Sequence, residues 1–238
     1  MWQNFISWAK SHRDHFVVAV IILFWLRALF IALFLQTDVN ELTEEATTFI
    51  RTATLYGLFS LSIIALLLYF AKRPWSEMGF QPKGFFNHTG IGILFGIGML
   101  VQHYLIAQPV IGFFIRPSAS DGIDPSVLFS DWNLLPFWIL LSVFKGGLEE
   151  ESWRMLEMTS FGKFWGKWGL VFGLVVGSVL FGIQHAYQGT DAVISTGIDG
   201  LLYGLIYLRK KSAWEAIAAH ATYDIVSIGA GYYFFAPW

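Results

Sequence analysis

Several ionisable residues stand in the most apolar half of this 238-residue chain. Glu149, His185, His220 and Asp224 each lie in or beside a run long enough to span a bilayer. A charged side chain within such a run costs roughly 2.5–3.5 kcal/mol. That cost is offset if the side chains meet inside the protein, and a buried cluster of carboxylates and imidazoles typically forms a reaction centre or a metal site.

The first group is the pair Glu149-Glu150, followed by Arg154. Residues four apart share one face of a helix, so we expect Glu150 to pair with Arg154, while Glu149 is rotated about 100° away and stays free. Glu151, at spacing three, is an alternative partner of the arginine. We therefore predict that Glu149 is the reactive carboxylate and that Glu150 and Arg154 support it. Taken alone, three consecutive glutamates near a helix end are more typical of a solvated face.

The second and third groups are histidines. His185 closes an apolar run and has Phe181 one turn before it, whereas His220 and Asp224 form an i, i+4 pair that brings imidazole and carboxylate within hydrogen-bonding reach. This spacing suits a metal site and a metal-free acid–base site equally well. The chain has no cysteine, which excludes thiolate ligands and a cysteine nucleophile.

Composition indicates the class of protein that must position these residues. The chain is 55% hydrophobic and only 13% charged, about half the charged share of a soluble domain, taken as about 25%. We expect an all-α, polytopic membrane protein with a buried catalytic cavity. The net charge of −2 and the lack of a basic stripe exclude a nucleic-acid partner.

Seven hydrophobic runs are expected to span the membrane. They cover residues 16–35, 49–70, 89–107, 133–148, 168–187, 191–208 and 213–234, and residues 109–115 are a candidate short or re-entrant eighth. We treat residues 1–238 as one integral-membrane domain, with anchor helices over about 16–108 and a catalytic core over about 133–235. Residues 74–88 look like an elbow at the membrane surface.

Loop charges predict the orientation. Basic residues fall on one side (Lys10, Arg13, Lys72, Arg73, Lys83, Lys163, Lys167 and 209–211), and acidic residues fall on the other (Asp38, Glu41, Glu44, Glu45, Asp121, Asp124 and Asp131). The amino terminus is therefore expected in the cytoplasm and the carboxyl terminus outside, in a multi-pass cell-membrane protein such as those of a bacterial inner membrane. Glycine pairs four apart, at 92 and 96, 169 to 177, and 200 and 204, are expected to pack helices closely.

The expected spans conflict with the expected site. If the fourth span ended near Leu148, Glu149 would lie about 25 Å from His185 along the next helix. The two side chains can meet only if the fourth helix continues through Met158 or if residues 159–167 re-enter the membrane.

The three groups together resemble a known family. Glu149-Glu150-x-x-x-Arg154 with Trp153 before the arginine, Phe181-x-x-x-His185, and His220-x-x-x-Asp224 are similar to the three ordered motifs of the CPBP family of intramembrane proteases, also called the Abi or CAAX prenyl protease 2 family. The likeness covers about residues 137–227. The amino-terminal third is similar only in being hydrophobic, with an elbow before the core.

The resemblance implies a glutamic-type peptidase that cuts near the end of a membrane-associated peptide or protein. It implies that Glu149 and His185 activate a water, and that His220 and Asp224 polarise the scissile carbonyl and stabilise its oxyanion. We favour a metal-free site, because these pairs supply both functions without an ion; zinc held by Glu149, His185, His220 and Asp224 is the alternative.

Two residues depart from the family pattern. Met155 stands where many relatives carry glycine, and Asp224 stands where many carry asparagine. An ionised Asp224 would repel an oxyanion, so it must either carry a proton or act through a protonated His220. Asp199, inside the sixth span, is outside the pattern and is expected to pair with Arg27 or Arg51, or to line the cavity.

Two functions follow from these observations. The first is an intramembrane endopeptidase acting on a CAAX-type tail, a leader peptide or a sorting signal. The second is a membrane immunity factor, scaffold or proton-coupled transporter that uses the same buried carboxylates without proteolysis.

Overall fold

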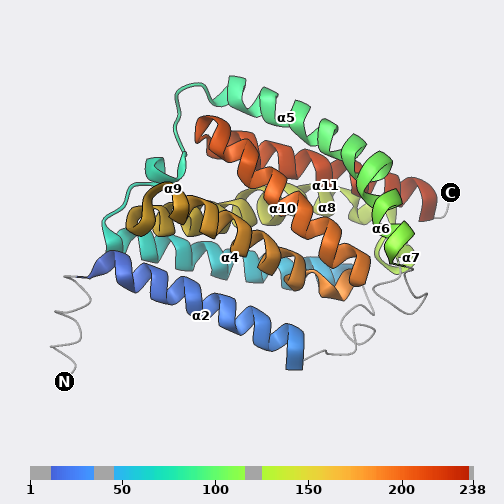
Figure 1. Cartoon of the computed structure of the whole chain (residues 1–238). Coiled ribbons are helices and arrows are strands. Elements are labelled where there is room, and N and C mark those ends of the chain that lie inside the picture. Colours follow the sequence, from blue (N-terminus) through green and yellow to red (C-terminus); the bar gives the residue numbers. More distant parts are fainter. Residues whose placement is uncertain (1–11, 35–45, 116–124, 236–238) are drawn as a thin grey trace.

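The computed structural model describes residues 12–34, 46–115 and 125–235, and every regular element within these ranges is helical (Figure 1). The predicted all-α class is thereby confirmed. The α-helices are α2 (Arg13–Phe34), α4 (Ala46–Ala71), α5 (Phe85–Gln102), α6 (Gln108–Phe114), α7 (Pro125–Leu128), α8 (Leu135–Leu141), α9 (Glu151–Gln184), α10 (Thr190–Lys210) and α11 (Ala213–Phe235). Two π-helices, η2 (His103–Ala107) and η4 (Ser142–Glu150), and three 3-10 turns, η1 (Trp75–Met78), η3 (Trp132–Leu134) and η5 (Ala186–Gln188), complete the order.

Five helical stretches are long and apolar enough to cross a membrane. They are Arg13–Ile31, Ala46–Ala71, Phe85–Phe114, Trp132–Gln184 and Thr190–Lys210. This pattern is that of a multi-pass membrane protein. The separate re-entrant segment expected at 109–115 is wrong, because α6 continues from α5 through η2 within one stretch.

The longest of these stretches folds back on itself. Trp165 and Gly166 leave the helical conformation, with Gly166 at φ 56°, a region that favours glycine. Beyond this turn Gly169 faces the backbone of Phe161. Residues eight apart in an unbroken helix would be about 12 Å apart, so the two arms of α9 form an antiparallel hairpin.

The hairpin removes the conflict between the expected spans and the expected site. The helix that carries Glu149 continues past Met158 to the turn, which is the first of the two solutions that the sequence allowed. Counted from Gly166, Glu149 lies about 25 Å along one arm and His185 about 28 Å along the other. Glu149 and His185 therefore lie at similar distances from the hairpin turn, on opposite arms.

Glycine rows bring the helices together, as predicted. Gly173 faces the backbone of Met158 across the hairpin, Gly92 faces Glu215 and Ala218 of α11, and Gly204 faces Leu174. Each close approach would be blocked by a side chain at the glycine.

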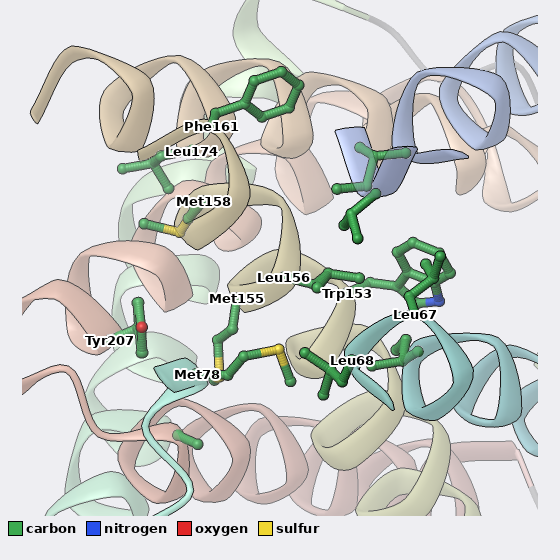
Figure 2. Packing of buried hydrophobic residues seen from close by; sticks show 14 of the residues in the cluster. Leu67, Leu68, Met78, Trp153, Met155, Leu156, Met158, Phe161, Leu174 and Tyr207 are labelled. Carbon is green, nitrogen blue, oxygen red and sulfur yellow. The ribbon is translucent and has the colours of Figure 1, made fainter. Parts of the chain in front are cut away.

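A hydrophobic cluster surrounds the hairpin (Figure 2). It joins Met155, Leu156, Met158, Phe161 and Leu174 of α9 to side chains from α2, α4, the elbow and α10. Within the bundle, α5 packs along α11, and α9 packs against α10 and α2 (Figure 1). The arm with Glu151 and Arg154 is thus surrounded by protein.

The basic loops lie at one end of the bundle. Lys163, near the hairpin turn, forms ion pairs of 3.3 Å with Asp14 of α2 and with Glu77 of the elbow. Arg73 donates to Ser160 and Thr159 at 2.7 and 2.8 Å, which ties the elbow to the hairpin. Lys10 and the acidic residues Asp38, Glu41, Glu44, Glu45, Asp121 and Asp124 lie outside the described residues.

Candidate active site

The π-helix η4 sets the direction of the first motif. In a π-helix the hydrogen bonds run from i to i+5, so residues four and five apart both come close together. Lys145 accordingly forms ion pairs with Glu149 at 2.5 Å and with Glu150 at 2.6 Å. Sequence analysis missed Lys145, although a lysine inside an apolar run just before two glutamates was a usable signal.

Glu149 lies on the side of the helix that faces α4. It is 1% exposed, accepts a hydrogen bond from Ser60, and pairs with Lys145. Ser60 in turn accepts from the indole of Trp153. None of the contacts found for Glu149 among the described residues involves a histidine, so Glu149 and His185 do not pair directly. The extra residue per turn in η4 is the physical reason for this rotation.

Arg154 pairs with Glu151, not with Glu150 as predicted. Its Nε donates to the two carboxylate oxygens of Glu151 at 3.2 and 3.0 Å. Glu151 is fully buried and also accepts a hydrogen bond of 3.0 Å from His220 Nδ1. Because a carboxylate fixes the ring of the histidine that donates to it, Glu151 orients His220 with its Nε2 toward Glu150 and Asp224. The alternative partner noted in the sequence is the observed one.

His220 is the centre of the cluster. Its Nε2 lies 3.7 Å from a carboxylate oxygen of Glu150 and 3.7 Å from one of Asp224. The predicted His220–Asp224 proximity is therefore present, at a distance longer than a hydrogen bond. The helix that carries both residues packs against η4 so closely that a methyl group on Gly146 would overlap the Asp224 carboxylate.

His185 approaches the cluster from the end of the second hairpin arm. Its Nδ1 donates to the Phe181 carbonyl at 2.7 Å, and in a neutral imidazole this leaves Nε2 free to accept a proton. His185 interacts electrostatically with Glu150, Lys145 and His220. The structure thus gathers Glu150, His185, His220 and Asp224, and it places Glu149 behind Lys145.

Aromatic rings enclose the imidazole of His220. Tyr203 stacks on it with 4.2 Å between centroids and 14° between planes, and Phe181 meets it edge-on at 5.9 Å. Phe181 also lies 4.7 Å from the guanidinium of Arg154. Tyr203 thus covers one face of the His220 imidazole, and Phe181 lies beside it.

Glu157, a further carboxylate of this helix, helps to pack α2 against α9. Glu157 is 7% exposed and accepts a hydrogen bond of 2.8 Å from the indole of Trp25 in α2. This contact joins the first helix to the hairpin. Among the described residues, no group of three or more His, Cys, Asp or Glu is arranged to hold a metal ion.

Five long apolar helical stretches define the class as a multi-pass membrane protein, and carboxylates and an imidazole lie close together inside it. Comparison with protein families agrees with this class. Residues 131–226 match the family described as type II CAAX prenyl endopeptidase Rce1-like, which agrees with the resemblance seen in the three motifs. Neither curated proteins nor solved structures gave a match.

Proposed function

We propose that this protein is an intramembrane endopeptidase that cleaves near the end of a membrane-associated peptide or protein. The observation that carries the proposal is the convergence of Glu150, His185 and His220 within the family-matched segment. A CAAX-type tail, a leader peptide and a sorting signal are all substrates of the required chemistry.

Glu150 and His185 are the groups that activate water in this proposal. Glu150 pairs with Lys145 at 2.6 Å, and its electrostatic neighbours include both histidines. In a neutral His185 the proton lies on Nδ1, which donates to the Phe181 carbonyl, and Nε2 is the nitrogen that can accept a proton. A water between them can lose its proton to this nitrogen as it attacks the scissile carbon. Glu149 then acts indirectly, by holding Lys145 in place.

His220 and Asp224 are the groups that stabilise the oxyanion. Glu151 and Arg154 hold His220 from behind, so that Nε2 points away from them toward the reacting carbonyl. A positioned donor at this place stabilises the charge that develops on the carbonyl oxygen. His185, which took the proton from the water, can then pass it to the leaving amine.

We further propose seven membrane passes, with the amino terminus in the cytoplasm. The count follows if the two arms of α9 are separate passes and α11, which runs for 23 residues along α5, is another. The orientation rests on the basic residues that gather at the hairpin end. Cysteine labelling from each side of sealed vesicles tests it, and protection of Lys163→Cys from a cytoplasmic reagent would overturn it.

Paired variants test the site. Wild type, Glu150→Gln, Glu149→Gln and His185→Gln are expressed at equal membrane levels in a deletion strain, and new peptide termini are measured by mass spectrometry. We expect Glu150→Gln and His185→Gln to abolish cleavage, and Glu149→Gln to retain at least a tenth of it. Equal loss in both glutamate variants would contradict the assignment of Glu150. Unchanged peptides and an unchanged phenotype in all variants would favour the alternative, a non-proteolytic immunity factor, scaffold or transporter.

The dependence of cleavage on a metal ion is tested separately. We expect turnover by purified protein to survive dialysis against a zinc chelator. Loss of cleavage that returns with added zinc would establish the zinc alternative.

A further inference from the structure

Arg27 is a cation in the apolar part of the first helix, and neither the three motifs nor the proposed mechanism uses it. It lies in α2, within the stretch Arg13–Ile31 that is long and apolar enough to cross a membrane, and the residue is exposed. A charge in such a stretch is costly to place in the bilayer, and an ionisable residue there is by default a candidate for function.

The ion pair expected between Arg27 and Asp199 is not formed. Asp199 is 3% exposed in α10, and one of its carboxylate oxygens lies 3.5 Å from Nδ1 of His103 in η2. Arg51, the other expected partner, forms no ion pair with Asp199 among the described residues either. The charge of Arg27 therefore does not neutralise the buried aspartate.

The contacts found for Arg27 are with aromatic side chains. Its guanidinium lies 6.0 Å from the ring centroid of Phe24 and 5.8 Å from that of Tyr56 in α4, and it donates a hydrogen bond to the Tyr56 hydroxyl. A ring face attracts a cation but does not neutralise it. Within the described part of the chain no carboxylate pairs with Arg27, so its other N–H groups remain available to an anion.

Tyr56 connects Arg27 to the first motif. Lys145 Nζ lies 5.5 Å from the same ring centroid, so by the sum of the two distances the cations are no more than about 11 Å apart. Lys145 contacts a carboxylate oxygen of Glu150 at 2.6 Å. The Arg27 guanidinium is therefore within about 14 Å of the Glu150 carboxylate, by the sum of the three distances.

Arg27 also lies at about the depth of the site. Asp14, in the first turn of α2, pairs with Lys163 near the hairpin turn, and Arg27 follows Asp14 by about 20 Å along the helix. Glu149 lies about 25 Å from the same turn along its own arm, and α2 packs against α9. The exposed cation is thus far from the basic loops and close to the level of the reactive residues.

We propose that Arg27 binds the carboxyl-terminal carboxylate of the peptide substrate and so selects peptides that are cut near their end. A carboxylate within the bilayer needs a cation, and a guanidinium matches it with two parallel hydrogen bonds. An extended chain covers about 3.3–3.6 Å per residue, so no more than about four residues fit between Arg27 and a scissile bond beside Glu150. The inference rests on the proposed function and names the group of the substrate that the site would recognise.

Two peptides that differ only at their last atom group test the proposal with the wild-type protein. Each has a farnesylated cysteine followed by three residues, and one ends in a carboxylate while the other ends in a carboxamide. Purified protein in phosphatidylcholine vesicles is expected to cleave the carboxylate peptide with a kcat/KM at least tenfold higher, because a charge-assisted contact is lost in the amide. Mass spectrometry of the products measures the two rates, and equal values overturn the proposal.

Substitution of the arginine is expected to remove this preference. Arg27→Gln lowers kcat/KM for the carboxylate peptide about tenfold and leaves the value for the amide peptide within twofold of wild type. Arg27→Lys keeps the charge and is expected to retain at least a threefold preference. Arg51→Gln, which removes an exposed charge from α4, is the matched control and changes neither value by more than twofold. An equal loss for both peptides in Arg27→Gln would assign a structural role and overturn the proposal.

The length of the peptide tail tests the geometry. With eight residues after the farnesylated cysteine, the end of an extended tail lies well beyond Arg27, since four residues already cover the available distance. The carboxylate and amide forms of this longer peptide are expected to be cleaved within twofold of each other. A tenfold preference that persists at this length would place recognition of the carboxylate elsewhere.

Binding without cleavage separates failure of this inference from failure of the proposed function. Glu150→Gln is expected to bind the shorter carboxylate peptide about tenfold more tightly than its amide, and adding Arg27→Gln is expected to abolish the difference. If wild type cuts neither peptide but the difference is found, only the proposed function fails. Equal binding, or no binding of either peptide, overturns the inference. A loss in Arg27→Gln that is equal for both peptides and requires anionic lipid in the vesicles would assign Arg27 to a lipid phosphate instead.

Discussion

The helical arm around residues 149–157 has two sides that use carboxylates differently. Toward α11, Glu150 and Glu151 meet His220, which lies 3.7 Å from the first and 3.0 Å from the second. Toward α2 and α4, Glu149 accepts from Ser60 and Glu157 accepts from Trp25. All four carboxylates are largely enclosed, and both sides lie in the same apolar bundle.

The difference shows that burial alone does not identify a reactive carboxylate. Hydroxyl and indole donors only satisfy a charge, and such contacts hold helices together. Imidazoles can also exchange a proton near neutral pH, and they can act on a substrate. The type of partner therefore separates the reactive side of the arm from the packing side.

The largest effect is expected on the reactive side. His220→Gln removes the proposed oxyanion donor and is expected to lower peptide cleavage by roughly 10²–10³-fold, as for other oxyanion donors. His88→Gln, at the far end of α5 and paired with Glu215, is the control and keeps cleavage within about twofold of wild type. Equal losses would show that both histidines are needed for folding and that the effect is not specific to the site.

Breaking the Glu151 network is expected to cost both stability and activity. Glu151→Gln leaves Arg154 without its charged partner, and removing one partner of a buried ion pair costs about 3–5 kcal/mol. Thermal unfolding in detergent measures this loss, and cleavage per folded molecule is expected to fall as well. Glu157→Gln is the matched variant from the packing side: it lowers the unfolding temperature but leaves cleavage per folded molecule unchanged. Loss of that activity in Glu157→Gln would erase the distinction between the two sides.

The hairpin itself can be tested at its closest approach. Gly173→Leu forces a side chain against the backbone of Met158 and is expected to destabilise the protein by about 1–3 kcal/mol or more. Gly98→Leu is the control, because a side chain there meets open space. Folded yield and unfolding temperature are the measurements. Equal behaviour of the two variants would be inconsistent with an antiparallel hairpin.

Trp25→Phe probes the packing side alone. It leaves a Glu157 oxygen without its donor, at a cost of about 1–3 kcal/mol in unfolding free energy. Cleavage per folded molecule is expected to stay within about twofold of wild type. A large loss of cleavage without a loss of stability would move Glu157 to the reactive side.

The smallest effect is expected at Asp224. Asp224→Asn places a neutral group of the same shape beside His220 and is expected to retain most of the cleavage, within about threefold. Complete loss would show that the carboxylate acts as a base or as a metal ligand.

Much of the fold could be predicted because few backbone structures are stable in the hydrocarbon core of a membrane. Within the described residues, the apolar runs predicted at 16–35, 49–70, 89–107 and 191–208 coincide with helices, and the glycine rows lie at helix contacts. The helix ends were less predictable, since the arm that carries Glu149 remains helical beyond Leu148, through polar residues that an apolar-run criterion excludes.

Less of the site could be predicted. The ideal spacing of 3.6 residues per turn placed Glu150 above Arg154, whereas η4 rotates the motif and Lys145 pairs with both glutamates. A π-helix leaves no clear mark in residue type. The neighbours of Asp199 were equally unpredictable, because His103 is 96 residues away in the chain and comes close only through packing of η2 against α10.

The sequence by itself determined that this is a helical membrane protein with motifs of a protease family, because hydropathy and motif spacing are local properties. Only the tertiary structure decided which glutamate meets the histidines and which charges act on Asp224. Those outcomes depend on a chain reversal at Gly166 and on the rotation of one helix about its axis, and packing between distant segments sets both.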